Sequence, residues 1–339
     1  MLPLPVSYPQ QKFSYGKIAI RDGTLLNVLR SRARVTNLGL IILSIVAFFS
    51  LLLNVNIWID TAPGLPRSIL STLKGDRIVE NLDHLIIVPG HAIWNGASAE
   101  QRLDEDLWTL EPYQRNSGRV EAFYQHIAHA TQLSLQDEHA LVVFSGFATF
   151  FMTCNDFLKI YPDRGQTRRD TTTTEAESYM RLAMQANLLP RDFTRATTDN
   201  YALDSHQNLL FSIARFHEFT GVYPARITVV GYEMKRKRFT DLHRTAVRWS
   251  RSRFEYIGID SNDSPSESKT AQEGELKTYI ETSKDMYHCH SQLLQKRRNR
   301  NHHRRFHPYH VSSPELSDLM EWCPSEGSML YNGLLPWTQ

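Results

Sequence analysis

The chain lacks the short motifs that would assign it to a common enzyme class. Its 339 residues contain no Gly-x-Gly-x-x-Gly, no phosphate loop ending in Gly-Lys-Ser/Thr, no His-Glu-x-x-His and no Gly-x-Ser-x-Gly. These absences argue against the ordinary nucleotide-binding, zinc-protease and serine-hydrolase classes. The chain also has little excess charge of either sign, since its 38 Lys and Arg residues nearly balance its 36 Asp and Glu residues. We expect no nucleic-acid partner, because such domains are usually strongly basic.

Cysteine is scarce as well. Cys154, Cys289 and Cys323 lie far apart and show none of the paired spacings of zinc or redox motifs. At most one disulfide can form, so oxidising and reducing compartments both remain open. The histidines from His288 to His310 match no known ligand spacing, and we expect a basic surface there rather than a metal site.

The most distinctive feature that is present is an uncharged apolar run from Leu38 to Ile59, which follows Arg30, Arg32 and Arg34. At about 1.5 Å per residue this run can cross roughly 30 Å of hydrocarbon, which predicts a single transmembrane helix. A signal peptide is the alternative, but the run begins late and exceeds the usual length of about 15 residues. The basic flank predicts a cytosolic N-terminus, with the globular part in the lumen of the endoplasmic reticulum or Golgi, or outside the cell.

Composition divides the chain into five predicted parts. They are a cytosolic segment (1–37), the transmembrane helix (38–59), a stalk rich in Pro and Gly (60–80), an α/β domain (81–260) and a basic and aromatic extension (261–339). The extension contains enough apolar residues to pack back on the domain.

Short, continuously apolar segments alternate with helical patterns between residues 81 and 260. Such segments are typical of strands buried on both faces of a parallel sheet. We expect strands at His84–Val88, Ala140–Phe144, Arg226–Val230 and Phe254–Ile259, and a shorter one at Phe193–Ala196. We expect helices at Gly118–Leu133, Thr174–Leu188 and Ser205–Thr220. The predicted fold class is α/β, a Rossmann-like three-layer αβα arrangement with a mostly parallel sheet.

Ligands of such sheets bind beyond the carboxyl ends of the strands. Gly90 and His91 follow the first predicted strand, and Ser145 and Gly146 follow the second. The glycines would let backbone amides approach a ligand, and His91 is a candidate for proton exchange. A tight turn with a surface histidine is the plainer interpretation of the first pair.

Further candidates lie at helix starts and in a basic turn. Glu175 opens a helix, where the dipole alone favours a carboxylate, although proton transfer is a second possible role. Asp204 is explained as an N-cap, but together with Asn208 it also suits a polar ligand. Arg236 and Arg238 lie in a basic turn after a strand, which is either an exposed turn or a clamp for phosphate or carboxylate.

Taken together, these segments resemble the SanA/YdcF-like family of unknown function, in particular its fungal branch. The resemblance covers roughly residues 82–260 and is carried by segments 86–91, 142–146, 175–177, 204–208 and 227–231. Ser205 and Gln207 depart from the threonine and glutamate usual in the family, and Met234 stands near the position of an expected histidine. The resemblance implies a Rossmann-like sheet, often membrane-tethered, with a crevice for S-adenosylmethionine or another anionic small molecule.

Two functions therefore remain in view. The first is binding of an anionic or nucleotide-like small molecule, such as S-adenosylmethionine or a phosphorylated glycan or lipid-carrier metabolite. Glu175 and His91 would then serve any proton transfer, and Gly90, Ser145, Gly146, Asp204, Asn208, Arg236 and Arg238 would bind the ligand. The second is a non-catalytic scaffold at the membrane that uses the basic run and the aromatic tail.

Overall fold

The computed structural model describes residues 34–60, 81–147, 172–260, 265–301 and 303–338. The chain divides into two compact units, Met1–Ala62 and Pro63–Gln339, which are described separately. The predicted stalk, almost all of the predicted cytosolic segment, and Cys154 lie outside the described residues.

The first unit contains one long helix, α2 (Arg34–Asp60). The large apolar side chains described between Leu38 and Leu53 are exposed. Among the residues that the structure describes, no helix combines the length and the apolar character needed to cross a membrane. The transmembrane helix expected at 38–59 is thus not supported by the structure and stays a prediction from the sequence.

The second unit is built on a parallel sheet of five strands in the order β5-β4-β1-β6-β7. The strands are β1 (His84–Pro89), β4 (Ala140–Ser145), β5 (Ala196–Asp199), β6 (Arg226–Gly231) and β7 (Phe254–Gly258). The predicted α/β class with a parallel sheet is confirmed. The order is that of doubly wound sheets: β4 and β5 are added on one side of β1, and β6 and β7 are then added on its other side.

The edge strand is displaced from its expected position. We expected it at Phe193–Ala196, but β5 begins at Ala196. Phe193 instead closes a turn, in which its amide donates to the carbonyl of Pro190 over 3.0 Å. The aromatic residue suggested a strand, whereas the backbone bond of the turn determines the actual start.

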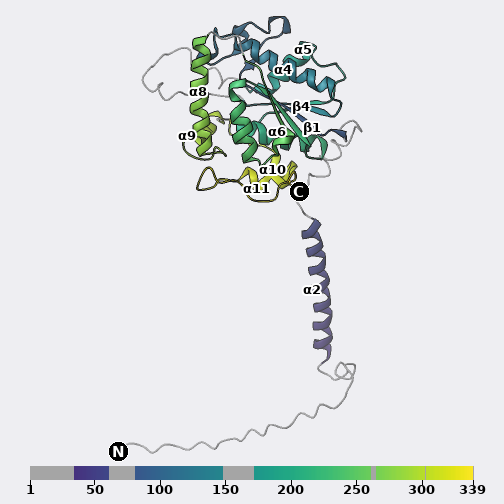
Figure 1. Cartoon of the computed structure of the whole chain (residues 1–339). Helices are drawn as coiled ribbons and strands as arrows, with labels where there is room; N and C mark the ends of the chain where they lie inside the picture. The colour runs from purple at the N-terminus through teal and green to yellow at the C-terminus, as the bar shows by residue number, and fades with distance from the viewer. Residues whose placement is uncertain (1–33, 61–80, 148–171, 261–264, 302, 339) are drawn as a thin grey trace, which may run out of the picture. The chain divides into compact units, whose positions relative to one another are not determined.

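Helices cover both faces of the sheet, as Figure 1 shows. Alternate residues of β1 point to opposite faces: Leu85 and Ile87 pack with α6, and Ile86 and Val88 pack with α4 and α5. The bounds are α4 (Arg119–Gln136), α5 (Glu175–Gln185), α6 (Ser205–Thr220) and α7 (Arg244–Ala246). Thr174 and Glu177 form a capping box at the start of α5.

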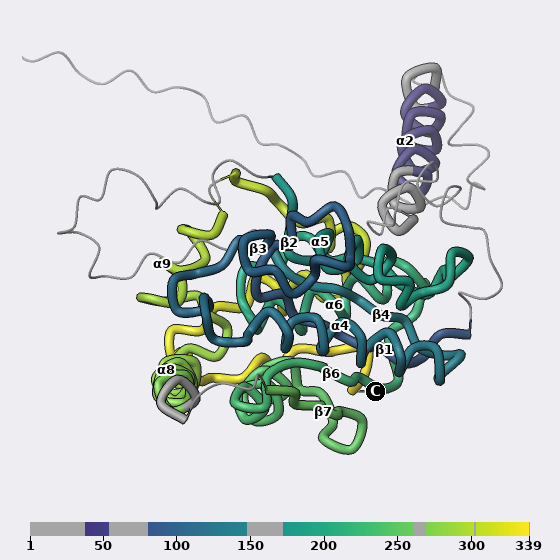
Figure 2. Tube along the Cα trace, turned by 90° about the horizontal axis from the view of Figure 1, so that it is seen from above, coloured from purple at the N-terminus to yellow at the C-terminus, as the bar shows by residue number. Residues whose placement is uncertain are grey.

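The C-terminal residues contribute to the same unit. Their helices are α8 (Pro265–Lys284), α9 (Ser291–Arg300), α10 (Tyr309–Ser312) and α11 (Ser317–Met320). Tyr309, Leu319, Leu335 and Trp337 are buried in the core on the α6 side of the sheet. Figure 2 shows α8 and α9 together on one side of the sheet, where they help to enclose the cavity described below.

A two-stranded antiparallel sheet, β2 (Ile93–Trp94) with β3 (Trp108–Thr109), follows β1. The sequence analysis did not predict it, because two residues per strand are too few for a periodic pattern. Its Trp94 and Trp108 are buried against α4 and α5. The segment that follows β3, residues 111–115, lines one side of the cavity.

Candidate functional site

A cavity of about 760 Å³ opens at the carboxyl ends of the central strands. His91 reaches it from the segment after β1, and Lys235 reaches it from the segment after β6. β1 and β6 are neighbours in the sheet. The chain leaves β1 toward β4 on one side and later returns to form β6 on the other side. The cavity thus lies at the topological switch point, where ligands of doubly wound sheets bind.

The two predicted glycines lie at this edge, but their backbone amides are not available to a ligand. The Gly90 amide donates to the Ser145 carbonyl over 2.7 Å, and the Gly146 amide donates to the Asp199 carbonyl over 3.1 Å. The expectation that these amides hold an anion is therefore wrong. Both groups complete the sheet at its carboxyl end.

The glycines make room for Glu175 instead. A Cβ atom added to Gly90 would lie 2.5 Å from Glu175 Cβ, and one added to Gly146 would lie 2.7 Å from Glu175 Oε2. Glu175 is 3 % exposed and lines the cavity from the first turn of α5. The structure brings Glu175, Gly90 and His91 together, as the candidate assignments required.

Ser145 does not line the cavity; it lies behind it. Its hydroxyl is 2.8 Å from Asp199 Oδ2 and 3.0 Å from Asn208 Oδ1, and Tyr309 donates to the other carboxylate oxygen over 2.8 Å. Burial raises the pKa of Asp199 to about 6, against the opposing effect of these hydrogen bonds. Asn208 reaches the cavity wall, so the role of Ser145 is to orient Asn208 rather than to touch a ligand.

Asp204 lines the cavity and is also the N-cap of α6, as the plainer interpretation held. Its Oδ1 accepts the amide of Gln207 over 2.9 Å, and its Oδ2 pairs with His288 over 3.0 Å and with Arg297. Burial opposes the charged form of Asp204, but Arg297 and His288 outweigh it and hold its pKa well below the usual range. The carboxylate is thus saturated by the protein.

In the basic turn after β6, one predicted arginine lies on the surface and the other lines the cavity. Arg236 pairs with Glu233 on the surface and does not line the cavity. The prediction that Arg236 binds the ligand is therefore not supported, since its guanidinium is held on the far side of the turn. Arg238 does line the cavity, is 8 % exposed and pairs with Glu275 of α8 over 2.9 Å.

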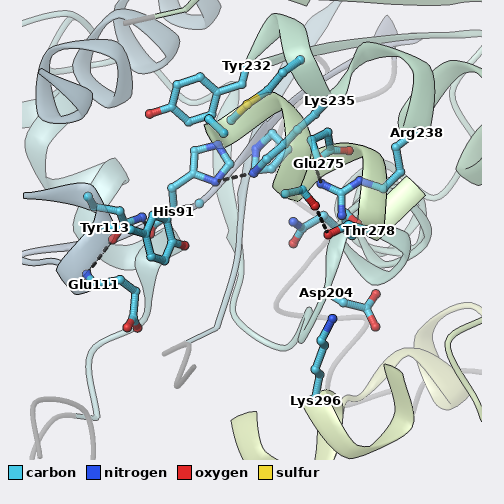
Figure 3. A pocket seen from close by; sticks show the side chains of 18 of the residues that line it. His91, Glu111, Tyr113, Asp204, Tyr232, Lys235, Arg238, Glu275, Thr278 and Lys296 are labelled. Atoms are coloured by element: carbon cyan, nitrogen blue, oxygen red, sulfur yellow. Dashed lines mark hydrogen bonds and ion pairs between the residues drawn. The ribbon is translucent and has the colours of Figure 1, made fainter. Parts of the chain in front are cut away.

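Lys235 is the functional candidate that sequence reasoning missed. It lies in the single-turn helix Glu233–Lys235, and the chain then continues into a π-helical turn, Arg238–His243. Its Nζ is 3.3 Å from His91 Nδ1, and Figure 3 shows the two side chains facing each other across the switch point. The run of four basic residues was the available signal, but it could not single out this one.

Burial and neighbouring charge tune this pair. Burial, followed by the charge of Lys235, lowers the pKa of His91 well below its ordinary value, so the imidazole is neutral. Burial, followed by the Arg238 guanidinium, lowers the pKa of Lys235 to about 7. In this arrangement the neutral Nδ1 accepts a hydrogen bond from the lysine amine.

The charges around the cavity favour an anionic occupant. Its cationic side chains are Arg115, Arg119, Lys235, Arg238, Lys296 and Arg300. Its acidic side chains are Glu111, Glu175, Asp204 and Glu275. Four of these six cations come from α9 or the turn after β6. No separate motif marked them in the sequence, because distant segments of the chain assemble the wall.

A group of possible metal ligands lies elsewhere. Cys289, His290 and Cys323 are close together, but the two cysteines form a disulfide. The disulfide that the sequence allows therefore joins Cys289 to Cys323. Within the described part of the chain no other group of three or more such ligands was found.

Comparison with known proteins identifies one relative. The uncharacterized protein YOR238W of Saccharomyces cerevisiae is 28% identical over 266 residues, which cover 66% of this chain and 86% of the yeast protein. No model of a known protein family matches the chain, and no solved structure matches it. The similarity extends over most of both chains and brings no activity with it.

Proposed function

We propose that this protein binds an anionic or nucleotide-like small molecule in the cavity at the carboxyl ends of β1 and β6. The observation that carries the proposal is the position of Lys235 in the cavity wall. Its ammonium lines the cavity at the switch point, and among the described residues no carboxylate lies within ion-pairing distance of it. A partly buried lysine that pairs with no carboxylate favours an anionic ligand that would supply the counterion.

The neighbouring cations support the same ligand class. Arg238 Nε is buried without a hydrogen-bond partner, although the other end of its guanidinium is paired with Glu275. Lys296 and Arg300 of α9 line the same cavity. Phosphate and carboxylate groups match such donors well.

The resemblance to the SanA/YdcF-like family fits this proposal but stands on the sequence alone. It adds S-adenosylmethionine to the ligands worth testing, alongside phosphorylated glycan or lipid-carrier metabolites. Attachment to a membrane through residues 38–59 likewise stays a prediction. Carbonate extraction of the full-length protein from membranes tests that prediction independently of the ligand.

The ligand is tested by the thermal midpoint of the full-length protein with nucleotides, nucleotide sugars, S-adenosylmethionine, inorganic phosphate and phosphorylated polyprenols. A ligand at about 100 times its dissociation constant adds roughly 2.7 kcal/mol, which raises the midpoint by several degrees. Lys235→Gln should abolish the shift. Lys237→Gln is the matched control, because it makes the same substitution two residues away at an exposed position that does not line the cavity. A shift that survives Lys235→Gln contradicts the proposal.

A further inference from the structure

Two lysines line the cavity, Lys235 and Lys296, and they differ in whether a carboxylate pairs with them. Lys296 Nζ is paired with Glu281 over 3.0 Å, whereas Lys235 Nζ lies 3.3 Å from a neutral imidazole nitrogen, Nδ1 of His91. The Tyr232 ring lies beneath the same ammonium, 5.6 Å from its centroid. Among the described residues no carboxylate is paired with Lys235, so no direct ion pair holds the lysine protonated.

The position of His91 explains how the amine is oriented. The imidazole is packed among the rings of Phe123, His126 and Tyr232, with centroids 5.1 to 5.8 Å away. Its Nε2 is buried without a hydrogen-bond partner, so Nδ1 is the atom that meets Lys235. One N–H of the Lys235 amine is therefore directed at His91 Nδ1. The other positions around the nitrogen are left toward the cavity that Lys235 lines.

The protonation state of Lys235 then differs from that of a surface lysine. With the pKa of Lys235 lowered to about 7, near half of the side chains carry a neutral amine at neutral pH. For a lysine of ordinary pKa the neutral fraction is smaller by about a thousandfold. A neutral amine in a cavity is a nucleophile, which is how lysines react with carbonyl compounds.

We propose that Lys235 forms an imine with a carbonyl compound that also carries an anionic group. This inference rests on the proposed function, because the remaining cations of the cavity would hold the anionic group. The lysine nitrogen adds to the carbonyl carbon and forms the C–N bond. The carbonyl oxygen then leaves as water with two protons taken from the nitrogen, so the step needs no oxidant, reductant or further reactant. His91 is a positioning residue in this step.

Several charged or titratable groups face Lys235 and affect its titration. They come from every element packed around it, namely His91 after β1, Glu175 of α5, Tyr232 at the end of β6, Arg238 in the π-helical turn, Glu275 of α8 and Arg300 of α9. Burial and the two arginines lower the pKa of Lys235, and the two glutamates raise it. A change in any of them should move the pH midpoint of the reaction.

The test uses the full-length protein with pyridoxal 5′-phosphate, an aldehyde that carries a phosphate. Borohydride reduces any imine to a stable amine, and peptide mass spectrometry locates it. At neutral pH we expect Lys235 to be labelled at least about tenfold more than Lys237, since the larger neutral fraction outweighs the weaker nucleophilicity of a weaker base. Equal labelling of the two lysines would overturn the inference.

Two further measurements keep the outcomes separate. Lys235→Arg retains a cation and removes the reactive amine, so labelling at this position should disappear while the thermal shift with inorganic phosphate persists. In the unsubstituted protein, labelling of Lys235 should reach half its maximum near neutral pH. A phosphate shift without labelling refutes the imine alone, whereas absence of both refutes the proposed function as well.

Discussion

The side chain of Glu175 occupies the space that Gly90 leaves open. A Cβ atom on Gly90 would stand 2.5 Å from Glu175 Cβ and 2.8 Å from its Oε2. Gly146, on the neighbouring strand end, faces the same carboxylate. The need for glycine at positions 90 and 146 is thus explained by the side chain of Glu175, which these glycines allow to lie at the cavity wall.

Gly90→Ala should destabilise the protein by roughly 1–3 kcal/mol, because Glu175 cannot move its own Cβ away from the added methyl group. Chemical denaturation measures the loss. In the double variant Gly90→Ala with Glu175→Gly, the combined loss should be smaller than the sum of the two single losses. Gly274→Ala is the control, since nothing lies within 4 Å of the added atom and the helical position should gain up to about 1 kcal/mol. Equal losses for Gly90 and Gly274 would refute this explanation.

Asp199 should make the protein more stable as the pH falls from about 6 toward 4. Its pKa is raised to about 6 by burial, so the folded state binds a proton more tightly than the unfolded state does. This stabilisation of the folded state amounts to roughly 3 kcal/mol. It is complete below the unfolded pKa and is lost as the pH rises through about 6. Unfolding free energies from pH 4 to 8 should show this dependence in the natural protein relative to Asp199→Asn. Parallel curves for the two proteins would argue against it.

Asp204 should act in the opposite direction. Its pKa is held well below the usual range, so its contribution is present above the unfolded pKa near 4 and is lost as the pH falls further. Asp204→Asn keeps an oxygen for the helix cap but leaves Arg297 without its counterion, at a cost of about 3–5 kcal/mol at neutral pH. Asp192→Asn, at an exposed position, is the control and should change little. Similar costs for the two variants would remove the role given to Asp204.

Reduction of the disulfide between Cys289 and Cys323 should lower the free energy of unfolding by roughly 3–4 kcal/mol, because the bond closes a long loop of the unfolded chain. The measurement is denaturation with and without a thiol reductant. The variant with both cysteines changed to alanine should match the reduced protein and ignore the reductant. Alkylation of both thiols in the native, unreduced protein would contradict the pairing.

The central strands and the start of α5 could be predicted from the sequence because their signals are local. The apolar run of His84–Val88 and the Thr174–Glu177 capping box lie within a few residues and carry their own physical cause. The start of β5 depends instead on a turn bond that no pattern showed. The short β2 and β3 strands carried no periodic signal at all.

The cavity could be predicted only in part. The sequence placed Gly90, His91, Glu175, Asp204, Asn208 and Arg238 at one edge of the sheet, and the structure brings all six to the cavity wall. Adjacent residues of a helical turn point about 100° apart, so the choice between Lys235 and Arg236 depended on how that turn packs. Glu275 and Lys296 come from α8 and α9, whose docking on the domain is a tertiary event.

The most direct measurement is titration calorimetry of inorganic pyrophosphate with the natural protein and with two single variants, Lys235→Gln and Arg236→Gln. Both variants replace a basic side chain of the same turn with glutamine, but only Lys235 lines the cavity. Loss of a charge-assisted contact should weaken binding by about tenfold or more in Lys235→Gln, while Arg236→Gln should leave the affinity nearly unchanged. Equal weakening in both variants, or binding that survives the loss of Lys235, would contradict an anion site at the switch point.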